Sequence, residues 1–381
     1  MQFTPEQEEF RAVVRDFALQ RIAPNAETWD REHTFPVDVV LEMGHLGLFG
    51  LVFPERWGGT DAGMTTLCLA IEEIGRVDQS LGVTVEVGTL GAEPLNRYGT
   101  EAQKERWLPD LVAGRALSGF GLTEPGGGSD AFATETRAEF RDGPGGGEWV
   151  LNGAKAFITN SGTPITSLVT LTARTGPEEI SAVIVPSGAP GFTVEPPYRK
   201  LGWHASDTHG LTLDECAVPA DHLLGEQRGQ GVHQFLRTLD AGRIAFAALA
   251  VGLIAGCLGE CLAYASERNA FGRPIGANQG IAFKCADMAV ALETSRLVTY
   301  EAARLYDEGK PYRRAAAIAK LAASEAAVAT AREATQVFGG YGFMDESPVS
   351  RFYRDAKILE IGEGTSEIQR LVISRECGLP V

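Results

Sequence analysis

A single glutamate near the C-terminal end of the chain stands where a general base could act. Glu363 lies between Gly362 and Gly364 and directly precedes a predicted helix, with Ser366 and Gln369 spaced as a capping box. The glycines allow the backbone to turn sharply and a ligand to approach closely. A carboxylate on such a corner can take a proton from a bound substrate. The alternative is a solvated acid at a helix start, where the helix dipole favours negative charge.

Four further segments have the composition of ligand-binding loops. Residues 121–130 combine hydroxyl groups with three consecutive glycines, whose backbone N–H groups are open to a flat or phosphorylated ligand. Residues 157–160 place an aromatic ring beside a hydroxyl group. Residues 268–274 hold two arginines in the turn between two predicted helices, and guanidinium groups bind phosphates. Residues 336–340 end another helix with paired glycines. Taken singly, each has an ordinary structural explanation as a loop, a strand end or a helix cap.

The charge of the chain limits its ligands. Its 381 residues carry a formal net charge of −16, with a pI near 4.9, which argues against binding to nucleic acids or anionic membranes. No CxxC pair or HExxH pattern predicts a metal site. The N-terminus lacks the pattern of a secretory signal, and the longest uncharged stretch, residues 244–259, is too short to span a bilayer. We therefore expect a soluble, cytoplasmic protein in which specific arginines and lysines hold any anionic ligand.

Three segments of different character must position these residues. Residues 1–117 show helical periodicity and begin with Thr4 as a helix cap. Residues 118–226 contain short β-branched runs separated by turn signals such as Asn152-Gly153, which predicts a small antiparallel β domain. Residues 227–381 are again helical and rich in alanine, with long helical runs near residues 230–267, 275–308 and 313–337. This order indicates an α+β fold, mostly α, with segregated layers. It argues against a nicotinamide-binding Rossmann enzyme, because no GxGxxG motif lies between a strand and a helix.

Taken together and in this order, these segments resemble the acyl-CoA dehydrogenase family. The resemblance covers essentially the whole chain. It depends on two long signature regions, residues 121–133 and residues 336–355. In the second region the matching positions are Gly339, Gly340, Gly342, Arg351 and Asp355. The family implies an N-terminal helical domain, a middle antiparallel β domain and a C-terminal four-helix bundle, with one FAD per subunit, usually in a homotetramer, although a dimer stays open.

The resemblance also assigns roles to individual residues. The positions implied to contact FAD, some of them from a neighbouring subunit, are Phe120, Leu122, Thr123, Ser129, Phe157, Ile158, Thr159, Arg268, Phe271, Gln279, Gln336, Gly339, Gly340, Thr365 and Glu367. The positions implied to contact the acyl-CoA are Ser129, Asp240, Arg243, Gly362 and Gly364. Glu363 matches the catalytic base.

Three departures from the family pattern bear on this site. Some relatives carry the base just before the arginine that matches Arg243, but Gly242 stands there, which leaves the role to Glu363. The residue before the base is often tyrosine, and here it is Gly362, so we expect a wider pocket that accepts branched acyl groups. Phe157 replaces a tryptophan at the flavin face, which keeps an aromatic surface without its N–H group.

The resemblance implies FAD-dependent α,β-dehydrogenation of a short or branched-chain acyl-CoA to the trans-2-enoyl-CoA. Glu363 is then the base, flavin N5 accepts the hydride, and electron-transfer flavoprotein is the expected acceptor, since no second redox centre is visible. Three alternatives stay open. They are a flavin oxidase on the same fold, a dehydrogenase acting on an acyl-carrier-protein thioester, and a helical scaffold without activity.

Overall fold

Six helices form the N-terminal part of the molecule. The computed structural model describes residues 2–143 and 146–380. The helices are α1 (Pro5–Phe17), α2 (Ala26–Glu32), α3 (Val37–His45), α4 (Gly63–Gly75), α5 (Gln79–Tyr98) and α6 (Glu101–Val112). Thr4 caps α1 as predicted, because its side chain accepts a hydrogen bond from the backbone N–H of Gln7. The α5 helix is buried over almost its whole length and reaches the middle of the molecule.

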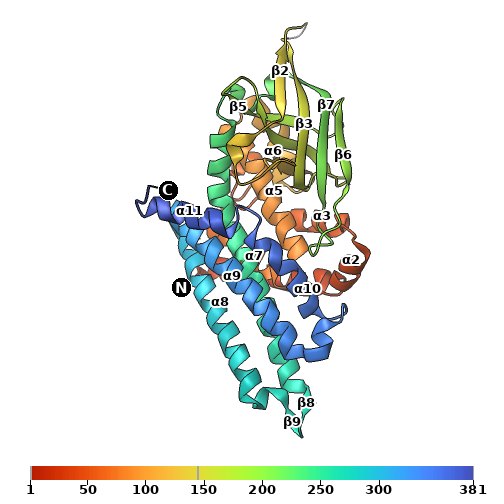
Figure 1. Ribbon diagram of the computed structural model, residues 1–381, viewed down its shortest axis with the longest axis vertical. Helices are drawn as coiled ribbons and strands as arrows, with labels where there is room; N and C mark the ends of the chain where they lie inside the picture. Colours follow the sequence, from red (N-terminus) through yellow and green to blue (C-terminus); the bar gives the residue numbers. More distant parts are fainter. Residues whose placement is uncertain (1, 144–145, 381) are drawn as a thin grey trace.

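A seven-stranded sheet follows and lies at one end of the molecule (Figure 1). Its strands are β1 (Leu117–Gly121), β2 (Arg137–Arg141), β3 (Glu148–Thr159), β4 (Thr166–Arg174), β5 (Ile180–Pro186), β6 (Phe192–Pro197) and β7 (Thr208–Pro219). The spatial order is β1-β4-β2-β3-β7-β6, with β5 beside β4. Most pairs are antiparallel, as predicted, but β1 and β2 each run parallel to β4.

The Asn152-Gly153 dipeptide, predicted to form a turn, lies inside β3. The register between β3 and β7 shifts between Leu151 and Gly153, so the glycine marks a bulge. A Cβ atom on Gly153 would lie 2.7 Å from the Cα of Thr136, a close approach that only glycine allows.

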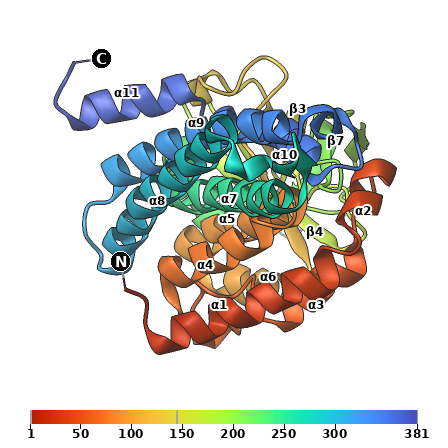
Figure 2. The same ribbon diagram turned by 90° about the horizontal axis from the view of Figure 1, so that it is seen from below.

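The C-terminal part is built from three long helices and two shorter ones. They are α7 (Gly231–Glu267), α8 (Gln279–Asp307), α9 (Arg313–Phe338), α10 (Pro348–Ala356) and α11 (Ser366–Glu376), and the short hairpin of β8 (Asn269–Ala270) and β9 (Arg273–Pro274) joins α7 to α8. Figure 2 shows α7 and α5 in the middle, with α8 and α9 on one side and α1, α3 and α4 on the other. One hydrophobic core joins the N-terminal and C-terminal helices.

The α7 helix is long and apolar enough to cross a membrane by length and composition alone. However, 83% of its most apolar window is buried inside the protein. Neighbouring helices α4, α5, α8 and α9 all pack against it. The apolar residues of α7 are therefore those of a core helix, and the helix forms the support on which the candidate base is held.

Candidate functional site

The loop that carries Glu363 connects a short 3-10 turn (Lys357–Glu360) to α11. Glu363 and Gly364 both adopt left-handed conformations, with φ angles of 55° and 92°. The side chain of Gln369 stabilises this strained turn, because it donates hydrogen bonds to the backbone carbonyls of Glu363 (3.1 Å) and Gly364 (2.9 Å). A non-glycine residue in this region is uncommon and often marks a functional position.

The cap of α11 differs from the sequence prediction. Thr365 is the N-cap residue, and its side chain accepts a hydrogen bond from the backbone N–H of Ile368 at 3.3 Å. The predicted capping box with Ser366 as the cap is therefore wrong by one residue. The cause is the left-handed Gly364, after which Thr365 takes the non-helical conformation that is typical of a cap.

One oxygen of the Glu363 carboxyl, Oε2, is shielded from solvent, although the residue as a whole is half-buried. Within residues 2–143 and 146–380, its Oε2 atom has no hydrogen-bond partner. Burial raises the pKa of Glu363 to about 7, although the positive charges of Arg243 and Lys320 act in the opposite direction. This location does not fit a solvated acid at a helix start. A carboxyl whose pKa lies near neutral is suited to general-base catalysis.

Two buried cations contact the backbone of the loop that carries Glu363. Lys320 of α9 donates a hydrogen bond to the carbonyl of Gly364 at 2.7 Å, and burial lowers its pKa to about 8. Arg243 of α7 lies 3.5 Å from the carbonyl of Glu363 and pairs with Asp240 at 2.5 Å. The structure thus places the predicted residue Arg243 against the base loop, with the predicted residue Asp240 beside it as its ion-pair partner. Lys320 was not predicted, since a lysine in an alanine-rich helix suggests an exposed residue.

The two glycines beside the base are both closely packed. A Cβ atom on Gly362 would lie 2.9 Å from the ring of Phe246, so the predicted gap at this position is already filled by a side chain of α7. A Cβ atom on Gly242 would lie 2.7 Å from Leu90 and 3.1 Å from Oε2 of Glu363. Gly242, which was identified only as a position that cannot supply the base, therefore lets the carboxyl of Glu363 lie against α7.

The predicted flavin-binding residues of the β part gather where β1 and β3 end. The backbone N–H of Ala156 donates to the carbonyl of Thr123 at 2.9 Å, which joins the glycine-rich loop to β3. Under this junction, Lys155 and Glu124 form a buried ion pair at 2.7 Å. The side chain of Phe157 is 64% exposed at a positive φ angle and presents an aromatic ring to solvent.

The other predicted residues of this part differ in exposure. Leu122, Thr123 and Thr159 are half-buried, and Ser129 is exposed. Phe120 stacks on Phe235, with ring centroids 4.2 Å apart. The side chain of Ile158 lies in the core of the sheet, so only its backbone is left to meet a ligand.

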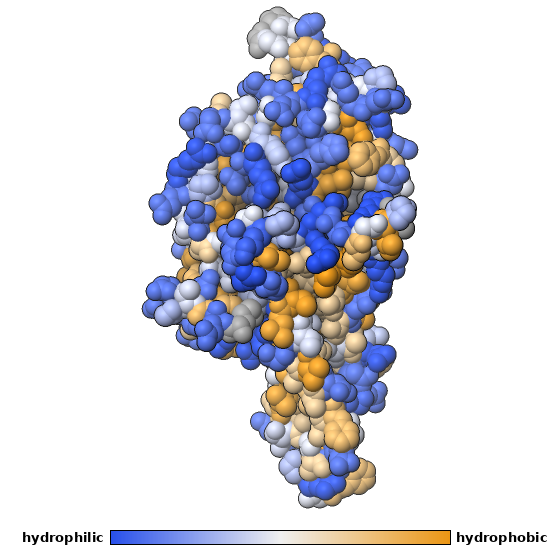
Figure 3. Space-filling view, turned by 90° about the vertical axis from the view of Figure 1, so that its left-hand side faces the viewer, coloured by the Kyte–Doolittle hydropathy of each residue, from blue (hydrophilic) through white to orange (hydrophobic). Residues whose placement is uncertain are grey.

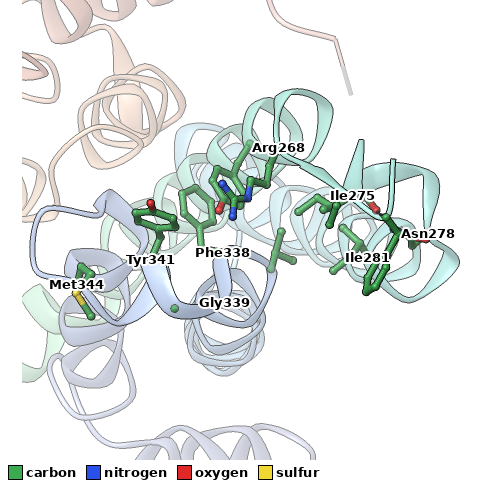
Figure 4. A pocket seen from close by; sticks show the side chains of 13 residues that line it. Arg268, Ile275, Asn278, Ile281, Phe338, Gly339, Tyr341 and Met344 are labelled. Carbon is green, nitrogen blue, oxygen red and sulfur yellow. Dashed lines mark hydrogen bonds between the residues drawn. The ribbon is translucent and has the colours of Figure 1, made fainter. Parts of the chain in front are cut away.

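A second group of predicted residues lines a groove of about 770 Å³ at the far end of the bundle (Figure 4). Arg268, Phe271, Gly339 and Gly340 all contribute to this groove. The guanidinium of Arg268 lies 5.7 Å from the ring centroid of Tyr341.

The structure leaves some predicted residues outside this groove. Gln279 and Gln336 are exposed and are not among its lining residues. Near the base, Thr365 is half-buried and Glu367 is exposed. The β8–β9 hairpin beside the groove and the start of α11 lie at different heights of the bundle in Figure 1, so one chain does not assemble all predicted residues into one site.

Comparisons with known proteins agree on one family. Three family models match, described as the N-terminal (residues 4–115), middle (residues 119–216) and C-terminal (residues 229–378) domains of acyl-CoA dehydrogenase. A "probable acyl-CoA dehydrogenase" of Bacillus subtilis is 46% identical, with 98% of each chain covered. The mitochondrial short-chain specific acyl-CoA dehydrogenase of Mus musculus is 44% identical over 96% of this chain and 88% of its own.

Solved structures show the same likeness. Butyryl-CoA dehydrogenase from Megasphaera elsdenii has a TM-score of 0.95 and 38% identity, with 99% of both chains covered. A glutaryl-CoA dehydrogenase from Mycobacterium smegmatis in complex with FADH2 has a TM-score of 0.93 and 32% identity, covering 99% of this chain and 95% of that one. These matches confirm the resemblance and the fold class that the sequence motifs predicted.

Proposed function

The chain belongs to the acyl-CoA dehydrogenase family of flavin-dependent oxidoreductases, and we propose that it oxidises a short-chain acyl-CoA to the trans-2-enoyl-CoA with Glu363 as the base. The observation that carries this proposal is the carboxyl of Glu363, whose Oε2 atom is buried without a partner and whose pKa is raised to about 7. Such a group is ionised often enough at neutral pH to accept a proton, and basic enough to remove a weakly acidic one.

The residues of the chain fit FAD at two places. The exposed ring of Phe157 offers a flat surface beside Thr159. Gly126 and Gly127 leave open space in the glycine-rich loop that is hydrogen-bonded to β3 next to Phe157. At the groove, Arg268 forms no ion pair within the described residues, so its guanidinium is free for a pyrophosphate. When bound, FAD supplies the acceptor for the β-hydride at its N5 atom. Because the two places lie apart, we propose that one subunit completes the FAD site of another.

The exposed surface supports such an assembly. Apolar side chains are exposed along the bundle at Leu262, Phe283, Val290 and Leu297, and Figure 3 shows apolar surface on the lower part of the molecule, where Figure 1 places α8 and the β8–β9 hairpin. A patch of this kind marks a protein interface. We propose a homotetramer in the cytoplasm.

The substrate class follows from the relatives. Short-chain specific and butyryl-CoA enzymes are among them, so we propose butyryl-CoA and acyl groups of similar size. The expected preference for branched groups loses its support, because Phe246 fills the space beside Gly362. The chain shows no second redox centre in its sequence, so electrons leave to a separate protein, for which we propose electron-transfer flavoprotein.

Anaerobic titration with butyryl-CoA tests this function. The yellow flavin should bleach as the substrate is oxidised, and the colour should return on addition of electron-transfer flavoprotein but only slowly in air. Rapid return of the colour in air would instead identify an oxidase. Bleaching by acyl-carrier-protein thioesters alone would identify the other carrier, and no bleaching by any thioester would refute the proposal.

A further inference from the structure

The loop between β6 and β7, residues 198–207, reaches from the sheet to the helices that hold the base. Gly202 lies against α10, because a Cβ atom there would be 2.5 Å from Oδ1 of Asp355. The backbone N–H of the next residue, Trp203, donates to the same oxygen at 2.5 Å. Nδ1 of His204 lies 3.1 Å from a carboxylate oxygen of α2. The loop is therefore fixed to two helices at three consecutive residues.

Trp203 has an unusual backbone conformation at this point. Its φ angle is 54°, which is rare for a bulky residue and persists only where the surrounding structure holds it. The side chain is 7% exposed, and its Nε1 atom has no hydrogen-bond acceptor within residues 2–143 and 146–380. Among the described residues, the indole therefore contributes ring packing and no hydrogen bond.

The ring of Trp203 supports a side chain that lies directly beside the base. It meets Phe246 of α7 edge to face, with ring centroids 6.1 Å apart. Phe246 fills the space next to Gly362, where a Cβ atom would lie 2.9 Å from its ring. The ammonium of Lys320 lies 5.6 Å from the centroid of the same ring. Because Gly362 directly precedes Glu363, a displacement of Phe246 would free the turn that carries the base.

The same loop begins beside the proposed flavin face. Tyr198 packs on Phe157, with ring centroids 5.0 Å apart, and Trp203 follows five positions later in the sequence. The loop thus contacts the ring proposed to face the flavin and the ring that supports the base. Dehydrogenation needs the proton acceptor and the hydride acceptor at fixed positions around one substrate.

We propose that Trp203 is a positioning residue for the reaction, which holds Glu363 in place through Phe246. This inference rests on the function proposed above. A smaller side chain at position 203 leaves a cavity into which Phe246 can move, and water then reaches the turn that carries the base. A displacement of about 1 Å can cost roughly 10²-fold in rate. Because burial raises the pKa of Glu363, better solvation should lower it.

Three variants separate the ring of Trp203 from the general effect of losing a buried tryptophan. Trp203→Leu removes the ring and Trp203→Phe keeps one. Trp149→Leu is the matched control, because Trp149 is also buried but lies in the core of the sheet. The measurements are thermal unfolding and the values of kcat and KM for butyryl-CoA at pH 6 and pH 8, taken with the FAD-loaded enzymes.

Trp203→Leu should affect the chemical step and its pH dependence. At pH 8 kcat should fall about tenfold or more, while KM changes by less than about threefold. The ratio of kcat/KM at pH 8 to that at pH 6 is expected to be about 10 in the wild type, from a pKa of about 7, and should fall to about 4 or less in this variant. Trp203→Phe and Trp149→Leu should keep kcat and this ratio within about twofold of the wild type.

A double variant shows whether the effect passes through Phe246. Phe246→Leu should lower kcat in the same way as Trp203→Leu. The variant with both changes should lose about as much as the worse single variant, because the two substitutions remove one shared contact. Losses that multiply would overturn the proposal. The pH ratio reports the burial of the base, because every variant keeps the charged groups that face it, which are Arg243, Lys320 and Glu86.

The outcomes distinguish this inference from the proposed function. An unchanged kcat and pH ratio in Trp203→Leu, or the same losses in Trp149→Leu, overturn the role of Trp203 while the dehydrogenase activity stands. A wild-type enzyme that no acyl-CoA reduces overturns the proposed function itself. Should Trp203→Leu fail to fold, Trp203→Met also lacks the ring but has a flexible side chain that fills more of the space, and it is judged by the same two values.

Discussion

The pH dependence of the reaction should report the environment of Glu363. Burial raises the pKa of this carboxyl from its ordinary value of 4.5 to about 7. Because the base must be ionised to accept a proton, about a tenth of the free enzyme is competent at pH 6 and about nine tenths at pH 8. We therefore expect kcat/KM for butyryl-CoA to rise about tenfold between these two pH values. A carboxyl with an ordinary pKa would already be ionised at pH 6, and the profile would be almost flat.

Removing one supporting cation should move this profile. Lys320→Met takes away a positive charge that favours the ionised carboxyl, so the pKa of Glu363 should rise. The increase of kcat/KM with pH should then occur at higher pH than in the wild type. Lys310→Met is the matched control, because Lys310 is exposed and pairs with Glu308 at 2.6 Å. Initial rates with an artificial electron acceptor give the profiles, and an α-deuterated substrate checks that proton abstraction limits the rate. A flat wild-type profile, or the same shift in both lysine variants, would refute the reasoning.

Three further substitutions test separate parts of the site. Glu363→Gln should keep the fold and the flavin but lose roughly 10²-fold or more in turnover, and a variant with more than about a tenth of wild-type turnover contradicts the assignment. Arg268→Ala should lose FAD on dialysis more readily than Arg273→Ala, whose guanidinium bonds Asn278 at 2.7 Å; equal flavin occupancy in the two variants counts against the phosphate role. Gly362→Ala should destabilise the protein by roughly 1–3 kcal/mol in thermal unfolding, because its Cβ would lie 2.9 Å from Phe246. It should also lower kcat/KM for straight and branched substrates by the same factor. A decrease confined to branched substrates would instead support the predicted pocket for branched acyl groups beside Gly362.

Local signals in the sequence predicted most of the helices and the candidate base. The Thr4 cap, the glycines around Glu363 and the alanine-rich periodicity of residues 313–337 act within a few residues of the chain. The structure confirms the helix start at Thr4 and gives α9 nearly the predicted bounds. Such features need no knowledge of distant partners.

Features that depend on long-range packing were not predicted. The parallel pairing of β1 with β4 joins strands about 50 residues apart, and no local pattern distinguishes it from an antiparallel hairpin. Gly362 suggested an open pocket, but Phe246, more than a hundred residues earlier in the chain, fills that space. A glycine shows where a side chain is absent, whereas the neighbouring helix decides whether room is left.

Lys320, which was not predicted, nevertheless had a signal in the sequence. Lys320 shares one face of α9 with Ala316, Ala323 and Ala327, all of which are buried, so helical periodicity places a lysine where the helix has only small residues. An ionisable residue on the apolar face of a helix must find a partner, shift its pKa or serve a function. Lys320 meets this requirement in two ways, since it donates a hydrogen bond to the carbonyl of Gly364 and burial lowers its pKa to about 8.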